Sequence, residues 1–279
     1  MTRRRQKKRA RKDKLPREKR SRGLRKLGIL LVSVVLLSVS LAAGLLLSGL
    51  VTGDSSGPKT AVIVDQLSLT FPNPAFAETA TDMLEEAGYA VDYYSGEAVT
   101  VDLYRDLPKH DYELIILRVH SGIVRQIDPR SEERTVMEYV GLFTGEPYSD
   151  ATYGGREGAG RIGLAVARDY HGGQYFGVTP YFIEFTMEGR FDKATIILMG
   201  CDGLRSDRTA ESFVERGAET FVSWDGKVSA SHTDAATERL LQHLLTDGLT
   251  IQEAVTETMA EVGPDPSYGS ALLVYPSEA

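Results

Sequence analysis

The chain of 279 residues contains a single cysteine, Cys201, and a single tryptophan, Trp224. One cysteine cannot form an intrachain disulfide, so the fold does not rest on the disulfide framework of small secreted domains. Three roles are left open for Cys201: a buried apolar side chain, a crosslink between two chains, or a working thiol. Burial is the commonest of the three, and only the residues around Cys201 favour the working thiol.

Metal ligands are also scarce. The chain has five histidines, and none of them stands with a second His or Cys at the spacing of a zinc site. Ser231-His232-Thr233-Asp234 offers only one His and one Asp. The glycine-rich stretch around Gly154 and Gly172 does not follow a strand and open a helix, as a dinucleotide-binding loop does. The sequence therefore predicts no metal site and no cofactor.

Charge is absent from Leu27 to Gly53, where Leu, Val, Ile and Ala dominate. About 20 apolar residues cross a bilayer core as a helix, whereas the apolar part of a signal peptide has about 7–15. Residues 1–26 hold 15 basic and two acidic side chains, a net charge of +13. We predict a basic cytoplasmic tail (1–26), a transmembrane signal-anchor helix (27–51) and a polar linker (52–59).

The positive-inside rule places the residues after the linker outside the cytoplasm. A basic tail alone is also typical of a nucleic-acid-binding arm, but the adjacent apolar segment favours a membrane partner and no nucleic acid. Ala42-Ala43-Gly44 resembles a cleavage site, so a processed form stays open. The remaining 17 basic and 37 acidic residues make the rest of the chain strongly acidic.

Residues 60–279 are predicted to form one α/β domain with a mostly parallel sheet flanked by helices. Continuous apolar runs predict buried strands at 60–64, 90–94, 112–120, 194–199, 218–223 and 270–274. Apolar positions at helical spacing predict helices at 74–86, 207–216, 233–245 and 250–261. Between them, residues 122–192 are predicted to be an insertion over the active edge, with a β-hairpin or surface strand at 175–185.

Two of these strands end at residues that carry chemistry. The run that ends at Met199 is followed by Gly200 and Cys201, and the run that begins at Tyr112 is followed by His120. If the two strands are parallel neighbours, an imidazole and a thiol meet at the carboxyl edge of the sheet, where open α/β folds bind ligands. A neighbouring His lowers the pKa of a thiol and accepts its proton. The alternative for His120 is a structural residue at a sheet edge.

The other histidines are weaker candidates for a base. His110 lies in a polar loop, His171 in the glycine-rich insertion and His243 in a helix, while His232 heads a helix and is the next candidate. The small pair Ser121-Gly122 after His120 leaves backbone N–H groups available, and these, with the N–H of Cys201, are candidates for an oxyanion hole.

A hydrophobic strand ending in His120-Ser-Gly122, followed by one ending in Gly200-Cys201 and one ending in Ser223-Trp-Asp-Gly226, resembles the caspase-like cysteine peptidases (clan CD). This group includes caspases, metacaspases, gingipains, legumain, separase and bacterial CHAT domains. The resemblance covers roughly residues 60–275. It implies a caspase–hemoglobinase fold, a catalytic dyad of His120 and Cys201, and oxyanion contacts from the amides of Gly122 and Cys201.

The resemblance departs from caspases at the nucleophile. The caspase pattern Gln-Ala-Cys-x-Gly is replaced by Met199-Gly-Cys-Asp-Gly203, so cleavage after Asp is not inferred. In this group the residues that recognise the substrate side chain often follow the first strand or lie near the nucleophile. Asp65, Asp202 and Asp225 stand at such places, and each is equally suited to form a turn.

A carboxylate at the base of a pocket favours Arg or Lys, and Trp224 offers a flat wall for an aliphatic stem. The sequence thus predicts a membrane-anchored extracytoplasmic cysteine peptidase that acts on a protein or peptide substrate, with a preference for basic residues before the scissile bond. Two alternatives remain: a non-catalytic caspase-like binding module, and an acyl-transferase or esterase that uses the same dyad.

Overall fold

The computed structural model describes residues 58–127, 136–169 and 171–276. These residues belong to one compact unit that begins at Gly57. The predicted tail and signal-anchor helix, and all but Pro58 and Lys59 of the predicted linker, lie outside the described residues. Among the described residues, no helix is both long enough and apolar enough to cross a membrane.

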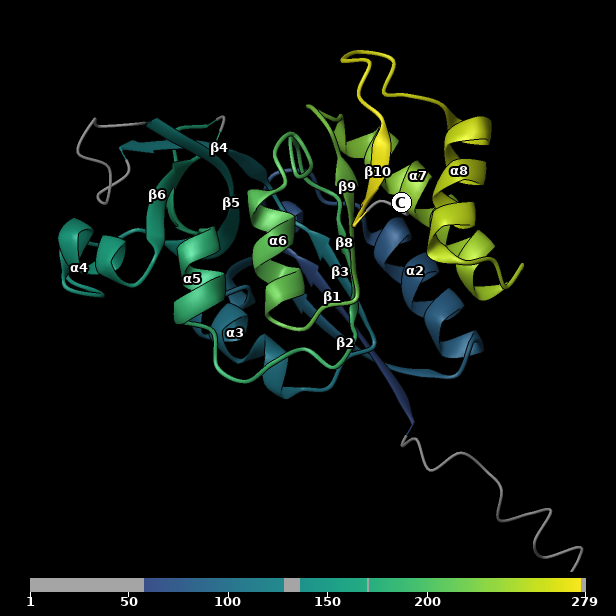
Figure 1. Ribbon diagram of the computed structural model, residues 1–279, viewed down its shortest axis with the longest axis horizontal. Helices are drawn as coiled ribbons and strands as arrows, with labels where there is room; N and C mark the ends of the chain where they lie inside the picture. The colour runs from purple at the N-terminus through teal and green to yellow at the C-terminus, as the bar shows by residue number, and fades with distance from the viewer. Residues whose placement is uncertain (1–57, 128–135, 170, 277–279) are drawn as a thin grey trace, which may run out of the picture. The chain divides into compact units, whose positions relative to one another are not determined.

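A six-stranded sheet forms the centre of the described unit (Figure 1). Its strands lie in the order β10 (Leu272–Tyr275), β9 (Thr220–Trp224), β8 (Thr195–Leu198), β3 (Leu114–Arg118), β1 (Lys59–Asp65) and β2 (Tyr89–Ser95). Every neighbouring pair is parallel except β9 and β10, which are antiparallel. The predicted α/β fold with a mostly parallel sheet is therefore confirmed.

Helices cover both faces of this sheet, which explains why its central strands are apolar throughout. On one face lie α2 (Pro74–Glu86), α7 (Ala230–Leu245) and α8 (Ile251–Val262), and on the other lie α3 (Val101–Asp106), α5 (Pro180–Phe185) and α6 (Arg208–Glu215) (Figure 1). Alternate residues of one strand serve the two faces: Ile116 of β3 packs toward α2 and α7, and Ile115 and Leu117 pack toward the other layer. Short 3-10 turns, η1 (Gln66–Leu69), η2 (Gly96–Ala98) and η3 (Leu107–Lys109), connect some elements.

Residues 121–178 build a second, antiparallel sheet that follows directly on β3. Its strands lie in the order β4 (Ser121–Ile127), β5 (Val136–Pro147), β7 (Gln174–Val178) and β6 (Leu164–Arg168), with α4 (Gly155–Arg161) between β5 and β6. Leu142, Phe176 and Val178 bury one face of this small sheet in the same core as α3, α5 and α6. Most of the predicted insertion is thus an ordered sheet that extends the core.

The structure corrects the sequence-based prediction within this insertion. Residues 175–185 do not form a hairpin or a continuous surface strand, because the strand β7 ends at Val178 and the helix α5 begins at Pro180. Proline is favoured in the first turn of a helix, where its missing N–H costs nothing, and Thr179 occupies the N-cap position. The helix α3 (Val101–Asp106) is a further element that is absent from the helices predicted from the sequence.

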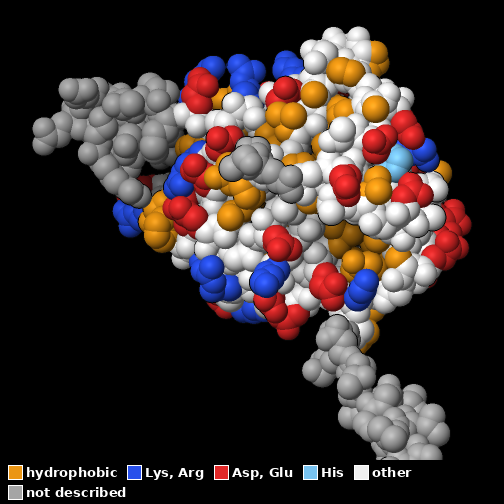
Figure 2. All heavy atoms as spheres, turned by 45° about the vertical axis from the view of Figure 1, so that its right-hand side comes forward, with side chains coloured by type: hydrophobic (Ala, Val, Ile, Leu, Met, Phe, Trp, Pro, Cys, Tyr) orange, Lys and Arg blue, Asp and Glu red, His pale blue; other side chains and the backbone are white. Residues whose placement is uncertain are grey.

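Basic and acidic side chains alternate over the face seen in Figure 2, with hydrophobic side chains between them. Large hydrophobic side chains that remain exposed include Phe71 and Tyr268, with exposed fractions of 44% and 56%. Both of these residues border the cavity at the carboxyl edge of the six-stranded sheet.

Candidate active site

His120 and Cys201 follow two strands that are parallel neighbours in the sheet. Strand β3 pairs with β8 in a register that sets Leu117 beside Leu198. His120 and Cys201 each stand three residues after this pair. Both residues line the same two cavities at this edge. The predicted adjacency of the two strands is confirmed, and it brings the imidazole and the thiol to one place.

Gly200 allows the segments that follow β3 and β8 to approach each other closely. A Cβ atom on Gly200 would lie 2.5 Å from the carbonyl oxygen of Val119 and 2.2 Å from Oγ of Ser121, closer than real Cβ contacts. Ser121 Oγ donates a hydrogen bond of 2.6 Å to the carbonyl of Cys201. The glycine before the cysteine is therefore required by the close packing of the two strand ends.

The segment after β1 holds His120 through three residues. The backbone N–H of His120 donates to Oε1 of Gln66 at 2.9 Å, and its Nε2 lies 2.8 Å from Oγ1 of Thr70. Phe71 meets the imidazole edge-on, with ring centroids 5.8 Å apart. The contact of Nε2 with Thr70 and the ring contact with Phe71 together fix the orientation of the imidazole.

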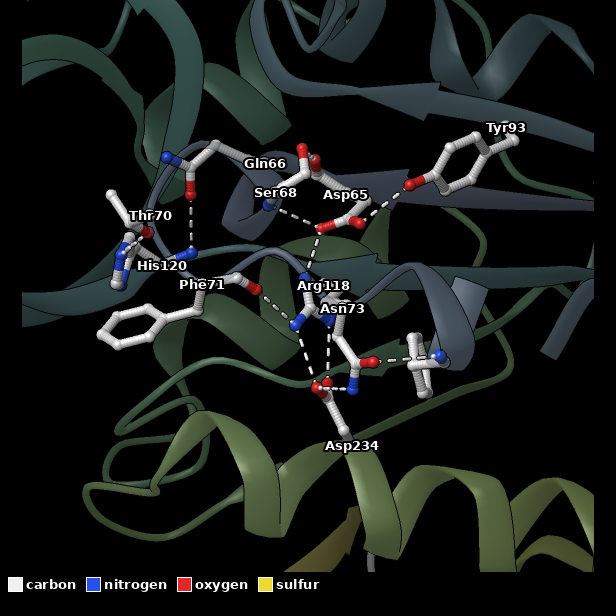
Figure 3. A network of polar contacts seen from close by, with 11 residues as sticks. Asp65, Gln66, Ser68, Thr70, Phe71, Asn73, Tyr93, Arg118, His120 and Asp234 are labelled. Atoms are coloured by element: carbon white, nitrogen blue, oxygen red, sulfur yellow. Dashed lines mark hydrogen bonds and ion pairs between the residues drawn. The ribbon is translucent and has the colours of Figure 1, made fainter. Parts of the chain in front are cut away.

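Arg118 ties this segment to the core of the domain (Figure 3). Its side chain has no exposed surface; Nη1 donates to Asp65 at 2.7 Å, and Nε and Nη2 donate to Asp234 at 2.8 and 2.9 Å. Nη2 also donates to the carbonyl of Phe71 at 2.9 Å. Two buried carboxylates thus fix one guanidinium, and that guanidinium fixes the backbone beside the imidazole.

Further hydrogen bonds complete the same network. Asp65 accepts from Tyr93 Oη at 2.9 Å and from the N–H of Ser68 at 3.0 Å. Asn73 donates to Asp234 at 2.8 Å, and its Oδ1 accepts from the N–H of Phe76 as the N-cap of α2. Burial, followed by the charge of Asp65, raises the pKa of Tyr93 to about 12. With these bonds, both carboxylates are satisfied within the protein.

Cys201 is held mainly by main-chain groups. The N–H of Val228 points at Sγ at 3.5 Å, and Sγ lies 3.6 Å from the carbonyl oxygen of Val228. Burial raises the pKa of the thiol, while the hydrogen bond from Val228 acts in the opposite direction. Burial also lowers the pKa of His120, and the charge of Arg118 adds to this effect against that of Asp169. Both directions favour a neutral thiol beside a neutral imidazole near pH 7.

The backbone donors around the dyad differ in direction. Within the described part of the chain, the N–H of Cys201 has no hydrogen-bond acceptor. The N–H of Phe143 donates to the carbonyl of His120, and the register sets Gly122 beside Gly141. Since bonded and non-bonded pairs alternate in an antiparallel ladder, the N–H of Gly122 points toward β5 and that of Ser121 away from it. The oxyanion contact predicted for the N–H of Gly122 stays a prediction, and the direction of the N–H of Ser121 makes it a further candidate donor.

Of the four residues predicted to bind substrate, the structure places Asp65 and Trp224 inside the protein. Asp65 is 1% exposed and engaged with Arg118. Trp224 has no exposed surface, and its Nε1 donates to Oγ1 of Thr233 at 3.0 Å. Neither residue lines either of the two cavities at the dyad.

Asp225 and Asp202 have different surroundings. Asp225 is exposed, and its carboxylate accepts from the N–H of Ala271 at 2.9 Å. Asp202 is 5% exposed, adopts a left-handed backbone with φ of 62°, and lines one of the cavities at the dyad. Among the described residues, its Oδ1 has no hydrogen-bond partner, and the nearest cation is Arg205 at 3.6 Å. The structure thus brings Asp202 together with the dyad and leaves the other three apart from it.

Two cavities meet at the dyad, and they differ in character. The first, of about 350 Å³, lies between the segment after β1 and the start of α7 and has mostly apolar walls. The second, of about 440 Å³, lies over the open face of the small sheet and includes Arg168, Asp169, Asp202 and Lys227. His120 and Cys201 stand in the walls of both.

Sequence reasoning missed Thr70, Gln66 and Arg118. A usable signal existed for Arg118, because a single charged residue in an otherwise apolar buried strand needs a buried partner. No comparable signal marks Thr70 or Gln66, whose roles depend on the path of the chain after β1. Within the described ranges, no group of three or more His, Cys, Asp or Glu is arranged to hold a metal ion.

Comparison with known proteins adds no relative. A scan against models of known protein families and a search of curated proteins both returned no match to this chain.

Proposed function

We propose that this protein is a cysteine peptidase of the caspase-like kind, anchored in a membrane, with a dyad formed by His120 and Cys201. One observation carries the proposal: the only thiol of the chain and a histidine oriented by a third residue lie at the ends of adjacent parallel strands, in the walls of two shared cavities. A nucleophile, a base and a group that orients the base are the parts that covalent acyl transfer requires.

The reaction proceeds by acyl transfer to the thiol. Nδ1 of His120 takes the proton of Cys201 as Sγ attacks the carbonyl carbon of the scissile peptide bond, while Nε2–H donates to Thr70. The N–H groups of Cys201 and Ser121 stabilise the negative oxygen, since the N–H of Gly122 points toward β5. The C–N bond then breaks, the amine leaves with the proton from His120, and a thioester remains. Water, deprotonated by His120, hydrolyses the thioester and restores the thiol.

The dyad is tested by substitution in the full-length protein. Cys201→Ala and His120→Ala should each lower the rate of peptide hydrolysis by at least about 1,000-fold, because catalysis by the two residues as a unit is lost. His110→Ala is the matched control, since His110 lies at the opposite end of β3 and is exposed. Hydrolysis that persists at wild-type rates in His120→Ala would show that another residue is the base.

The non-catalytic binding module remains a second candidate because of one observation. The thiol contacts the backbone of Val228, and burial raises its pKa, as expected for a structural cysteine. An esterase or acyl-transferase would use the same residues with another acceptor. Incubation with unfolded proteins, peptides and thioesters, with Cys201→Ala as the control, separates these three functions. A binding module turns over none of these substrates.

The predicted preference for basic residues rests on Asp202, because Asp65 and Asp225 already accept bonds within the protein. A substrate ammonium or guanidinium in the second cavity would meet a buried carboxylate whose Oδ1 lacks a hydrogen bond, in competition with Arg205, which lies 3.6 Å from it. Asp202→Asn should lower cleavage of Lys and Arg substrates by about tenfold or more, with little effect on uncharged substrates. Equal losses for both substrate classes would contradict this role.

The proposed compartment is extracytoplasmic, with a single span and a cytoplasmic amino terminus. Its support is the sequence pattern of residues 1–53, where a net charge of +13 precedes an uncharged apolar segment. Single cysteines placed after Gly53 in a Cys201→Ala background should react with an impermeant maleimide added to intact cells. Labelling only after lysis would show the opposite orientation in the membrane, and it would leave the proposed chemistry of the dyad unchanged.

A further inference from the structure

The cavity of about 350 Å³ beside the dyad is lined by residues from five separate segments. The segment after β1 contributes Leu67 and Phe71, the ends of β3 and β8 contribute Val119 and Met199, and the loops near α7 contribute Val228 and Tyr268. His120 and Cys201 close one side of it. The two residues that would react therefore form part of the cavity wall.

The polar groups in this wall are already bonded within the protein. Oγ1 of Thr233 donates to the carbonyl of Met199 at 2.9 Å and accepts from Trp224. Oγ of Ser229 donates to Asp265 at 2.6 Å. A ligand group in the cavity thus finds few unused donors or acceptors in these side chains.

Charge is missing from the same wall. Among the described residues that line the cavity, none is Asp, Glu, Lys or Arg. Asp234 lies on the same helix as Thr233, but it is 4% exposed and bonded to Arg118 and Asn73. A charged side chain in this cavity would lose its hydration without gaining a partner, and this is strongly unfavourable.

We infer that this cavity binds a large apolar side chain, such as Leu, Met or Phe, from one of the two residues that flank the scissile bond. The inference rests on the proposed function, because it takes the dyad as the place where the bond breaks. Mostly apolar walls with a volume of a few hundred Å³ are typical of sites that bury a ligand group. The exposed rims of Phe71 and Tyr268 offer the first apolar contact to an entering chain.

This site is separate from the proposed recognition of a basic residue, which would use Asp202 in the second cavity. Because the dyad lies in the walls of both cavities, an extended peptide that crosses the dyad can place one side chain in each. The substrate would then carry an apolar residue on one side of the cut and, where Asp202 acts as proposed, a basic residue on the other.

The first experiment profiles cleavage by the full-length protein. A library of internally quenched peptides is varied at both residues that flank the cut, and the products are identified by mass spectrometry. Leu, Met or Phe at one of the two positions should raise kcat/KM at least about tenfold over Ala, since a hydrophobic pocket discriminates by about that factor for a single methylene. Equal rates for Ala, Leu and Phe at both positions would overturn the inference.

A pocket-filling variant tests where the side chain binds. Ala230 lines the cavity in the first turn of α7, whereas Ala235 on the same helix is exposed. Ala230→Trp should lower cleavage of the Leu and Phe peptides at least about tenfold and leave the Ala peptides within a few-fold, while the matched control Ala235→Trp should keep the wild-type profile. Unchanged rates for Leu and Phe in a folded Ala230→Trp protein would place the apolar site elsewhere.

A labelling experiment keeps the cavity testable when no peptide is cleaved. Cys201 is the only thiol, so N-benzyl iodoacetamide and iodoacetamide compete for one site, and intact mass reports each product. The benzyl reagent should react in excess over iodoacetamide with the wild type, and Ala230→Trp should abolish this excess. A wild-type ratio equal to that of a free thiol would overturn the apolar site. An excess without any hydrolysis would reject the proposed function and retain the site; where Ala230→Trp does not fold, Phe71→Ala serves as the variant and should reduce the excess.

Discussion

The two halves of the proposed dyad are held by different kinds of structure. On the His120 side, the contacts come from side chains. Gln66 and Thr70 bind His120, and the buried Arg118 with its two carboxylates fixes the segment after β1. On the Cys201 side, they come mainly from the main chain, through the end of β8 and the backbone of Val228. Single substitutions can therefore remove several contacts one at a time beside His120. Beside Cys201, the bond from Ser121 Oγ to the carbonyl of Cys201 can be removed in this way, and other substitutions act by moving the backbone.

The largest effect is expected at Arg118. Arg118→Leu leaves Asp65 and Asp234 buried without their cation, and breaking a buried ion pair in this way costs about 3–5 kcal/mol of unfolding free energy. Urea unfolding, followed by circular dichroism, measures the loss. The control is Arg105→Leu, which removes an ion pair between the partly exposed Arg105 and the exposed Asp102. A loss as small as that of the control would show that the network does not anchor the fold.

On the Cys201 side, Gly200→Ala should have the next largest effect. The added Cβ would meet the carbonyl of Val119 at 2.5 Å, so the two strand ends must separate, at a cost of about 1–3 kcal/mol. Activity should fall more than stability, because the separation changes the distance between imidazole and thiol. Gly122→Ala, at a position with open space around the added methyl, is the matched control for folding. Full activity in Gly200→Ala would contradict the close approach.

Thr70→Val sharpens the comparison on the His120 side. The substitution keeps the shape of the side chain and removes the bond to Nε2, so the imidazole loses its orientation while the fold keeps its core. We expect kcat/KM to fall by about 10- to 100-fold, with a stability change below about 1 kcal/mol. Thr70→Ser should restore most of the rate, since it returns the hydroxyl. Equal rates in the Val and Ser variants would assign Thr70 a purely structural role.

The pH dependence should show the smallest effect. Burial holds the pKa of His120 below its ordinary value of about 6.5, so the imidazole stays neutral and able to accept a proton as the pH falls toward 6.5. The acid limb of kcat/KM should therefore lie below pH 6.5. Burial raises the pKa of the Cys201 thiol, so iodoacetamide should label the resting protein slowly at pH 7 and faster as the pH rises above about 8.5. An acid limb above pH 7 would show that the pKa of the imidazole is raised instead of lowered, and fast labelling at pH 7 would indicate a thiolate–imidazolium pair.

Much of this architecture was predictable from local patterns. Apolar runs located β1, β3, β8 and β9 to within a few residues, and parallel neighbours follow from the alternation of strands and helices. The juxtaposition of His120 and Cys201 was predictable for the same reason, because both stand just after such runs. The Pro180 helix was missed because aromatic and β-branched residues around it favour a strand in isolation.

The partners of the acidic residues were not predictable. Asp65, Asp202 and Asp225 look alike in sequence, since each stands after a buried strand or beside the nucleophile. Their roles diverge because Arg118 reaches Asp65, Asp225 accepts a hydrogen bond from Ala271 just before β10, and only Asp202 remains beside the dyad. Such contacts depend on where long side chains and loops meet in three dimensions, and a linear pattern of residues does not record this.

The chain passes from one sheet to the other in two residues. Strand β3 ends at Arg118 and β4 begins at Ser121, so Val119 and His120 are the whole connection between these two strands, and the chain returns from the small sheet to β8 through α5. The proposed base is thus also a short link between two sheets that share one core. A ligand that contacts the open face of the small sheet would touch the strand that continues directly from His120. Through this link, contacts made far along a ligand would lie close in sequence to the proposed base.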